Sequence, residues 1–326
     1  MRIHIQSPTD DPLFRFTQDQ WDEAASRASD LPEIHAVTLG ETVAELSDAM
    51  LEAEVLITDA ATVRSYFPGA AAHLKILFVT AAGLDGLAPY DWLPPGVALL
   101  NNRGAHSEKA GEYAAMAVLM LANRVVEFAT DQRERLWLKR YGSVLRNRRV
   151  TVVGLGGLGG AAAMQCRRFG MHVTGVRAHA APHEHCDDVV TPAGLDRVLA
   201  HTEFLILACP LTEATRGLID RRRFALLPET GCVVNIGRGG LIDQDALCDA
   251  LDSGRLRGAV LDVFEPEPVP ADHRLWTTRN LTMTPHVSSD DPATYNADSL
   301  DIFFDNLRAF AAGKALLNRF DTKRGY

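Results

Sequence analysis

Short apolar runs alternate with helix-like segments along almost the whole chain, and this rhythm is the strongest constraint on the fold. Each run is four or five residues long and is bounded by polar residues, glycine or proline. Fully apolar short strands separated by helices are typical of parallel sheets that helices cover on both faces. The sequence therefore predicts an α/β fold. The runs lie at residues 55–58, 76–79, 97–100, 149–153, 172–176, 204–207, 232–235 and 259–262.

The 326 residues are enough for about two domains of ordinary size. A glycine-rich loop near residue 154 lies in mid-chain, so a complete α/β unit precedes it. Residues 109–128 are predicted to form one long helix leading into the second domain, and residues 295–312 a long helix that packs on the first. We expect two Rossmann-like, doubly wound parallel-sheet domains with a cleft between them. The first is expected to be discontinuous, with the two domains at residues 1–102 plus 290–326 and residues 103–289.

The composition narrows the possible partners. The net charge of −9 argues against nucleic-acid binding, which needs a clustered basic face. No segment approaches the ~18 consecutive apolar residues of a membrane span, and residues 1–5 alternate like a strand and lack the apolar core of a signal peptide. The five cysteines are irregularly spaced and form no CxxC pair, so the sequence indicates neither a disulfide framework nor a metal site. We expect a cytoplasmic protein without nucleic-acid or membrane partners.

A glycine-rich loop follows the apolar run at residues 149–153. Gly154, Gly156 and Gly159 match the G-x-G-x-x-G pattern where a strand is predicted to end and a helix to begin, the context in which it indicates dinucleotide binding. The first glycine permits the tight turn, the second lets the backbone approach the pyrophosphate, and the third allows close helix–strand packing. The helix N-terminus attracts the anion. The predicted dinucleotide site comprises Gly154, Gly156, Gly157, Leu158 and Gly159.

The residue at the end of the next strand predicts which dinucleotide is bound. An acidic residue about 20 positions after the loop usually binds the ribose hydroxyls, but here the strand ends Gly175-Val-Arg177-Ala-His179 and no carboxylate is near. A carboxylate would repel a 2′-phosphate, whereas a guanidinium pairs with it. We therefore expect NADP(H) to be preferred over NAD(H). The alternative is that Arg177 is an exposed strand-end arginine and that either cofactor is used.

Three further motifs follow the glycine loop, in the order Asn235-Ile-Gly-Arg-Gly239, Asp262-Val-Phe-Glu-Pro-Glu-Pro268 and Thr284-Pro-His286. The guanidinium of Arg238 offers a rigid fork of donors suited to a carboxylate. His286 is a natural proton donor and acceptor near neutral pH, and a carboxylate such as Glu267 would orient its ring and favour the imidazolium. Each of these residues alone would be an ordinary loop residue. Behind a dinucleotide loop, together they predict hydride transfer to and from a carbonyl carbon.

These motifs resemble the D-isomer-specific 2-hydroxyacid dehydrogenase family, and the resemblance covers nearly the whole chain. In that family the matching positions make Arg238 the clamp on the substrate carboxylate, Glu267 the partner of the histidine and His286 the acid and base. The resemblance implies that the first domain is flavodoxin-like and binds substrate, and that the second is an NAD(P)-binding Rossmann domain. Besides the motifs above, it rests on the segments 81–85, 101–112 and 210–215.

The resemblance also assigns residues to the substrate and the cofactor. Two backbone amides would bind the substrate carboxylate beside the arginine and the histidine, and four more residues would line the cofactor. The substrate set is Ala82, Gly83, Arg238 and His286. The added cofactor set is Pro210 and Thr215 on the adenine and ribose side, and Asp262 and Ile236 near the nicotinamide amide.

The expected activity is interconversion of a small 2-oxo acid and an (R)-2-hydroxy acid. Glyoxylate and hydroxypyruvate are the first candidates, because a preference for NADP(H) suits reduction. Two alternatives stay open within what the resemblance implies. A phosphite-type dehydrogenase keeps the same trio of residues, and a dinucleotide-sensing corepressor has a similar sequence but works by binding other partners.

A homodimer is expected from the segment that follows the first long helix. Residues 131–137 and the next residue place Leu136, Trp137 and Leu138 among charged side chains. Relatives in the resembled family pair through the corresponding region. The alternative is a segment that packs on its own domain.

Overall fold

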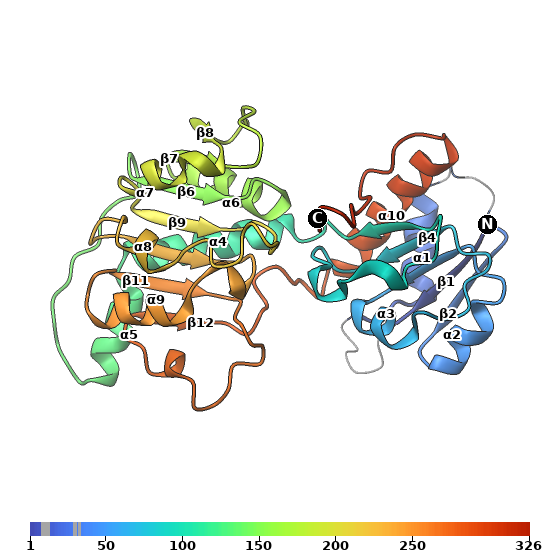
Figure 1. Cartoon of the computed structure of the whole chain (residues 1–326), viewed down its shortest axis with the longest axis horizontal. Helices are drawn as coiled ribbons and strands as arrows, with labels where there is room; N and C mark the ends of the chain where they lie inside the picture. Colours follow the sequence, from blue (N-terminus) through green and yellow to red (C-terminus); the bar gives the residue numbers. More distant parts are fainter. Residues whose placement is uncertain (8–13, 29–30, 32–33) are drawn as a thin grey trace. The chain divides into compact units, whose positions relative to one another are not determined.

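The structure is a computed structural model that describes residues 1–7, 14–28, 31 and 34–326. The chain divides into two compact units, the first made of Met1–His106 and Asp291–Tyr326 and the second of Ser107–Asp290 (Figure 1). The boundaries expected from the sequence lie within a few residues of these. Each unit has its own parallel sheet covered by helices, which confirms the predicted pair of α/β folds. The substrate and cofactor roles expected for the two parts stay predictions.

The first unit is built on a five-stranded sheet with the order β2-β1-β3-β4-β5. All neighbouring strands pair in parallel, and this order is that of flavodoxin-like folds. The strands are β1 (Arg2–Gln6), β2 (Ala36–Gly40), β3 (Val55–Thr58), β4 (Ile76–Val79) and β5 (Ala98–Asn101). The helices are α1 (Gln18–Arg27), α2 (Val43–Ala49), α3 (Ala60–Tyr66) and α10 (Tyr295–Ala311), with 3-10 turns η2 (Asp85–Leu87) and η3 (Tyr90–Trp92).

The C-terminal helix α10 completes the core of the first unit. It packs beside α1, and its buried Phe303 and Phe304 have ring centroids 6.3 and 5.0 Å from that of Trp21. Phe78 of β4 lies 5.9 Å from Phe303. Burying an aromatic side chain of this size stabilises the fold by roughly 2–3 kcal/mol. The end of the chain therefore belongs to the first unit, as the sequence predicts.

The second unit is built on a seven-stranded sheet with the order β12-β11-β10-β9-β6-β7-β8, again parallel throughout. The strands are β6 (Arg149–Val153), β7 (His172–Val176), β8 (Asp188–Val190), β9 (Phe204–Leu207), β10 (Cys232–Asn235), β11 (Gly258–Leu261) and β12 (Leu281–Met283). The helices are α4 (Ser107–Ala122), α5 (Val125–Arg133), α6 (Gly157–Arg168), α7 (Leu195–Leu199), α8 (Arg221–Phe224) and α9 (Gln244–Asp252). Three 3-10 turns complete it, η4 (Pro192–Gly194), η5 (Gly239–Leu241) and η6 (Arg274–Trp276).

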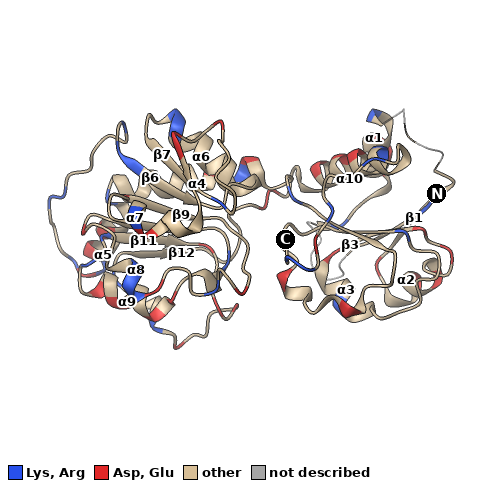
Figure 2. Cartoon of the chain, turned by 45° about the horizontal axis from the view of Figure 1, so that its top comes forward, with Lys and Arg blue, Asp and Glu red and all other residues tan. Residues whose placement is uncertain are grey.

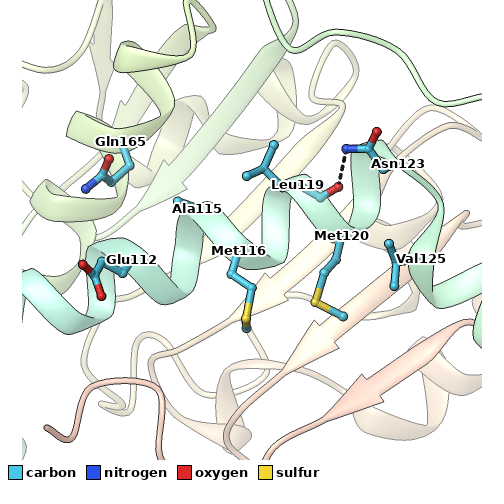
Figure 3. A pocket seen from close by; sticks show the side chains of 8 residues that line it. All are labelled: Glu112, Ala115, Met116, Leu119, Met120, Asn123, Val125 and Gln165. Atoms are coloured by element: carbon cyan, nitrogen blue, oxygen red, sulfur yellow. Dashed lines mark hydrogen bonds between the residues drawn. The ribbon is translucent and has the colours of Figure 1, made fainter.

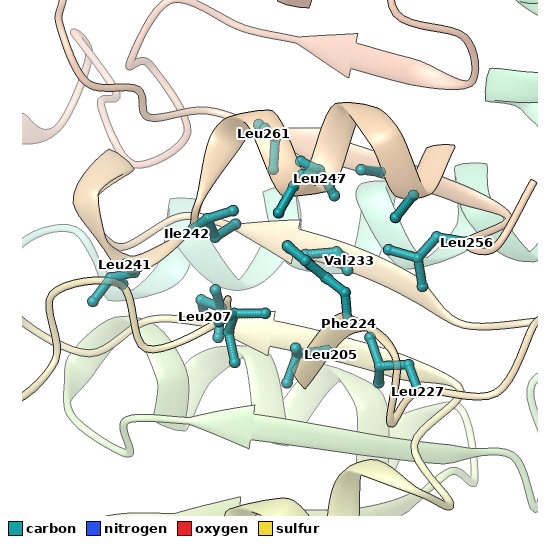
Figure 4. Close-up of a cluster of buried hydrophobic side chains, with 14 of the residues drawn as sticks. Leu205, Leu207, Phe224, Leu227, Val233, Leu241, Ile242, Leu247, Leu256 and Leu261 are labelled. Atoms are coloured by element: carbon teal, nitrogen blue, oxygen red, sulfur yellow. The ribbon is translucent and has the colours of Figure 1, made fainter. Parts of the chain in front are cut away.

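Two hydrophobic clusters cover the two faces of this sheet. One joins β9 and β10 to α8 and α9, with Phe224, Leu205 and Val233 buried at its centre (Figure 4). The other packs α4 and α6 on the opposite face. The strand order reverses between β6 and β9, and ligands of open α/β sheets bind outside the carboxyl ends of the strands at such a point.

The predicted long helix at residues 109–128 is wrong in one respect, because the segment forms two helices. α4 ends at Ala122 and α5 begins at Val125, and the pair is bent by 61°. Arg124 has the left-handed φ of 60°, and the Asn123 side chain donates to the Leu119 carbonyl at 2.9 Å. A left-handed residue ends a helix and frees the chain to turn. The apolar pattern continues through the bend, so periodicity alone does not reveal it.

Arginines in two short basic segments, residues 146–149 and 221–223, form ion pairs in the structure. In α8, Arg222 and Arg223 both contact Asp196, at 2.7 and 2.8 Å, and Arg148 contacts Glu203 at 2.6 Å. Figure 2 shows Lys and Arg interleaved with Asp and Glu on this view of the second unit. Among the described residues no single helix is long and apolar enough to cross a membrane. The bent pair α4 and α5 passes that test only by length and composition.

Candidate cofactor and active site

The glycine-rich loop connects β6 to α6 at the point where the strand order reverses. Gly154 has a φ of 92°, and a Cβ there would lie 2.6 Å from the Cα of Cys209. A Cβ on Gly159 would lie 1.8 Å from the carbonyl oxygen of Gly154. Backbone therefore occupies the space of any side chain at these two positions. This matches the turn and helix-packing roles that the sequence predicts for them.

Gly156 differs from its neighbours because the space around it is open. A Cβ there would meet no heavy atom within 4 Å, and its φ is an ordinary −80°. Gly156 is also the N-cap of α6 and supplies no side-chain cap. The first amides of α6, those of Gly157, Leu158 and Gly159, therefore have no capping oxygen from it. An open backbone surface beside uncapped helix amides fits a pyrophosphate, which such amides and the helix dipole bind.

Arg177 directly follows β7, and its backbone amide donates to the Val190 carbonyl at 3.1 Å. Its side chain is partly exposed. Among the described residues no hydrogen bond or ion pair is recorded for its guanidinium. Arg177 thus stands next to the strand that flanks β6, where the sequence predicts the 2′-phosphate contact.

The segment after β9 lies at the other side of the same switch point. The Thr215 hydroxyl donates to the Pro210 carbonyl at 2.7 Å and accepts from the Thr212 amide at 2.8 Å. These bonds fold residues 210–215 into a self-contained turn. Ile236 is buried just past β10, and its amide donates to the Leu207 carbonyl at 3.0 Å. The structure places all three predicted cofactor residues at carboxyl ends of strands, and their contacts with a cofactor stay predictions.

Arg238 is presented by a short loop after β10. The Asn235 side chain organises this loop, because it donates to the Arg238 carbonyl at 2.9 Å and accepts from the Gly237 amide at 3.1 Å. Gly239 brings the loop against the next one, since a Cβ there would lie 2.0 Å from the Phe264 carbonyl carbon. The Arg238 side chain is half-buried. The loop is therefore fixed by backbone packing on both sides of the arginine.

His286 and Glu267 form the side-chain pair that the sequence predicts. Their Nδ1 and Oε2 atoms are 2.8 Å apart, and the side chains are 46% and 35% exposed. The other carboxylate oxygen of Glu267 accepts from the Phe264 amide at 2.7 Å. Because Nδ1 faces the carboxylate, Nε2 is the ring nitrogen left to exchange a proton with a ligand. The pair has the chemistry of an oriented general acid and base.

Asp262 holds the loop that carries His286. Its carboxylate is 0% exposed and accepts from the Val287 amide at 3.0 Å and the Ser288 amide at 2.9 Å. Its carbonyl oxygen accepts from the His286 amide at 2.9 Å. The sequence predicts a nicotinamide contact here, which stays a prediction, whereas the recorded bonds make Asp262 a positioning residue. Two features of the sequence point to Asp262: it directly follows the apolar run that forms β11, and it begins the motif at residues 262–268.

A hydroxyl chain extends this network to α4, which the sequence does not reveal. The Thr284 hydroxyl donates to Asp262 at 2.5 Å, and Tyr113 Oη lies 2.6 Å from Thr284 Oγ1. Since the threonine proton goes to the carboxylate, the tyrosine must donate to the threonine. Burial raises the pKa of Tyr113 to about 12, so that its hydroxyl keeps its proton at neutral pH. No spacing rule links residue 113 to residue 284.

Ala82 and Gly83 belong to the first unit, in the loop after β4. The Asn101 side chain donates to the Ala82 carbonyl at 2.7 Å, and the Asn102 amide donates to the Ala81 carbonyl at 3.0 Å. These bonds tie the loop to the end of β5. The binding of a substrate carboxylate by its amides stays a prediction.

A groove of about 630 Å³ lies on α4 and the start of α5 (Figure 3). None of the predicted site residues lines it. Met116, Met120 and Leu119 of α4 line it, with the two methionines and Leu119 on opposite sides of the helix in this view, and Gln165 of α6 lies at one end. Its lining is mostly apolar and carries none of the acid, base or glycine-loop residues. The groove is therefore a surface feature of the helices, and we do not assign the chemistry to it.

The chain is similar to known oxidoreductases over most of its length. Residues 115–288 match the family described as D-isomer specific 2-hydroxyacid dehydrogenase, NAD binding domain. A glyoxylate reductase/hydroxypyruvate reductase of Homo sapiens is 32% identical over 259 residues, which are 76% of this chain and 77% of that protein. A glyoxylate/hydroxypyruvate reductase B of Yersinia pestis (strain Pestoides F) is 30% identical over 252 residues, 75% of this chain and 77% of that protein.

Solved structures of similar sequence share the fold of the whole chain. A D-isomer specific 2-hydroxyacid dehydrogenase from Xanthobacter autotrophicus Py2, in complex with NADPH and MES, has a TM-score of 0.81 and 28% identity and covers 99% of both chains. A protein of the same description from Aeromonas salmonicida subsp. salmonicida A449 has a TM-score of 0.81 and 28% identity, over 98% of this chain and 99% of that one.

Proposed function

The chain belongs to the D-isomer specific 2-hydroxyacid dehydrogenases, a family of NAD(P)-dependent oxidoreductases, and from that premise we propose that it reduces glyoxylate or hydroxypyruvate with NADPH. The observation that carries the proposal is the 2.8 Å pair between His286 and Glu267. A histidine oriented by a carboxylate in the same unit as a dinucleotide loop supplies a proton where a hydride acceptor becomes an alkoxide. Arg238, held between two packed loops, supplies the charge for the carboxylate of the acid.

Each residue of the site has a separate task in this proposal. The reduced nicotinamide supplies the hydride when it is bound. Arg238 binds the substrate carboxylate and so orients the neighbouring carbonyl. His286 gives the proton from Nε2 and takes it back in the reverse direction. Glu267 keeps the ring oriented through its bond to Nδ1. Asp262 keeps the loop of His286 in place.

Two observations support the finer choice of substrate and cofactor. The curated relatives described above are named for glyoxylate and hydroxypyruvate, and the Xanthobacter structure is described with NADPH. In this chain Arg177 stands at the end of β7 where an acid would favour NADH, and among the described residues no carboxylate pairs with it. A guanidinium there favours the additional phosphate of NADPH.

The test is a turnover assay with the purified full chain. Oxidation of NADPH and NADH is followed at 340 nm with glyoxylate, hydroxypyruvate, pyruvate and larger 2-oxo acids. The expected result is turnover of the two small acids with a higher kcat/KM for NADPH than for NADH, and an (R) product from hydroxypyruvate. NADPH binding without turnover of any 2-oxo acid contradicts the proposal and favours a dinucleotide-sensing role. Phosphite-dependent reduction of NADP+ would favour the phosphite-type alternative.

A further inference from the structure

The loop after Arg177 places a histidine against the first turn of α6. The Nε2 atom of His183 lies 3.4 Å, and its Cε1 atom 3.7 Å, from where a Cβ on Gly160 would be. The ring is only partly exposed, whereas His179 earlier in the same loop is exposed. Gly160 follows the glycine loop directly. His183 therefore stands beside the same uncapped helix end that fits the cofactor phosphates.

Hydrogen bonding decides which ring nitrogen of His183 can donate. The His185 amide donates to Nδ1 of His183 at 3.3 Å, so Nδ1 is an acceptor and carries no proton in this arrangement. In a neutral imidazole the other nitrogen then carries the hydrogen. The Nε2–H of His183 is the donor that faces α6. No protein acceptor for that nitrogen is recorded among the described residues.

The charges around His183 are those of a site for an anion. Burial, and then the nearby side chains of His185 and Arg177, lower the pKa of His183, and Glu184 opposes them. Burial raises the pKa of the adjacent Cys186 thiol to about 11, so that this thiol is uncharged at neutral pH. His183 is consequently a neutral donor next to a guanidinium for which no carboxylate partner is recorded in the described part of the chain. The Nε2–H of His183 and the guanidinium of Arg177 are therefore both available to interact with one bound anion.

We propose that His183 is a specificity residue for NADPH, donating from Nε2 to the 2′-phosphate that Arg177 pairs with. This inference rests on the proposed function, because it presupposes that the glycine loop binds a dinucleotide. A phosphate monoester has several acceptor oxygens and can bind a guanidinium and a neutral N–H donor at the same time. The same side chains do not make a metal site, since no group of three or more metal-binding side chains that could hold an ion occurs among the described residues.

The experiment measures binding and needs no turnover. Dissociation constants are determined for NADPH and NADH by fluorescence, and for adenosine 2′,5′-bisphosphate and 5′-AMP by calorimetry. The variants are His183→Ala and His183→Phe, which removes the donor but keeps a ring, with His179→Ala as the matched control in the same loop. Arg177→Ala is measured alongside them. Circular dichroism and unfolding midpoints verify that each variant is folded.

Loss of one hydrogen bond to a phosphate is expected to weaken NADPH and the 2′,5′-bisphosphate about tenfold in both His183 variants. NADH and 5′-AMP should bind as before, and His179→Ala should change nothing. Equal weakening of NADH, or full affinity of His183→Phe for the bisphosphate, overturns the inference. If the unaltered protein binds NADPH no better than NADH, the proposed cofactor preference fails as well. If Arg177→Ala alone abolishes the preference while both His183 variants keep it, only the inference about His183 fails.

Discussion

His286 adopts the left-handed backbone conformation, with a φ of 58°, which is uncommon for residues other than glycine. The conformation persists because its amide is bonded to the carbonyls of Asp262 and Thr284, at 2.9 and 3.0 Å. A left-handed residue costs roughly 1–2 kcal/mol, which the bonds of the loop offset. The backbone of the residue that moves the proton in the proposed reaction is thus placed by Asp262 and Thr284, while Glu267 contacts its side chain.

Replacing the acid and base is expected to remove most of the activity. His286→Asn and Arg238→Ala should each lower kcat/KM for glyoxylate by about 100-fold or more, the range for a lost proton donor or charge clamp. Glu267→Gln should lower it less, because the amide still accepts from the ring. NADPH affinity, measured by fluorescence, should stay within about twofold, since none of these three residues belongs to the glycine loop. Near-normal turnover of His286→Asn would refute the proposed role, and His179→Asn serves as the control.

Loosening the network behind His286 is expected to act on turnover. Asp262→Asn places an amide group against backbone donors, which costs about 1–3 kcal/mol, and should lower both kcat and the unfolding midpoint. Tyr113→Phe removes only the outermost hydroxyl of the Tyr113–Thr284–Asp262 network. It should lower kcat several-fold with KM little changed. A pH–rate profile separates positioning from stability. A misplaced histidine shifts the acidic or basic side of the plot of kcat against pH, whereas a loss of stability alone does not. Unaltered kcat and profile in Tyr113→Phe, with Thr284→Val also silent, would contradict the network.

The glycines of the glycine loop are required for different reasons. Gly154 and Gly159 are required by the backbone itself, because any Cβ would overlap a neighbouring main chain. Gly156 has an ordinary φ and open space, so the fold alone does not require a glycine there. A glycine at residue 156 is required only if a ligand approaches the backbone there.

This difference predicts opposite results for two alanine substitutions. Gly159→Ala should destabilise the chain by several kcal/mol in urea unfolding, because its Cβ overlaps a carbonyl oxygen. Gly156→Ala should leave the unfolding free energy within about 0.5 kcal/mol, or raise it slightly, and yet weaken NADPH about tenfold or more by fluorescence titration. If Gly156→Ala bound NADPH normally, the dinucleotide site would not lie on this loop.

The buried His4 of β1 makes the stability of the first unit depend on pH. Burial lowers the pKa of His4 below the ordinary 6.5, and the ring is bonded to Thr38 and Gln6 at 2.8 and 3.0 Å. Below pH 6.5 the unfolded chain therefore binds a proton that the folded chain resists. Stability should be complete above that pH and fall as the pH drops toward 5. Urea unfolding from pH 7.5 to 5 checks this, and His4→Gln should show a shallower loss; an equal slope would exclude His4 as the cause.

At the scale of elements, periodicity located segments better than it located their ends. α2 begins at Val43, with Leu46 buried inside it and Met50 buried at its C-cap. Val43 and Leu51 are 66% and 64% exposed, because the buried stripe is narrower than the apolar set. The bend between α4 and α5 was missed because it depends on one left-handed residue, which apolar spacing does not encode.

Over the whole molecule, exposed apolar side chains concentrate on one stretch of the second unit. Large hydrophobic residues that are at least 37% exposed occur repeatedly from Met116 to Val144, with Trp137 at 94% and Tyr141 at 80%. The groove of Figure 3 lies on the same helices. An extended apolar surface of this kind is the mark of a protein interface.

We propose that this surface pairs two copies of the chain, as the sequence predicts. Trp137→Arg should convert a dimer into a monomer in sedimentation at micromolar concentration, because it places a charge in the desolvated centre of the contact. Trp276→Arg is the matched control, since that tryptophan is 52% exposed but lies outside the stretch. A monomeric unaltered protein, or a dimer that survives Trp137→Arg, would contradict this proposal.

The α/β architecture, the discontinuous first unit and the glycine loop could all be predicted from the sequence, and the family resemblance implied the pairing of His286 with Glu267. These depend on local rhythm and on residue types whose chemistry is specific even before folding. The groups that hold that pair in place, the bend after α4 and the approach of His183 to α6 became visible in the folded chain alone. Residues 262 and 284 come together because the parallel strands β11 and β12 end side by side, and residue 113 reaches them because α4 packs on that sheet. Such contacts depend on packing between distant segments, and no spacing in a single sequence encodes them.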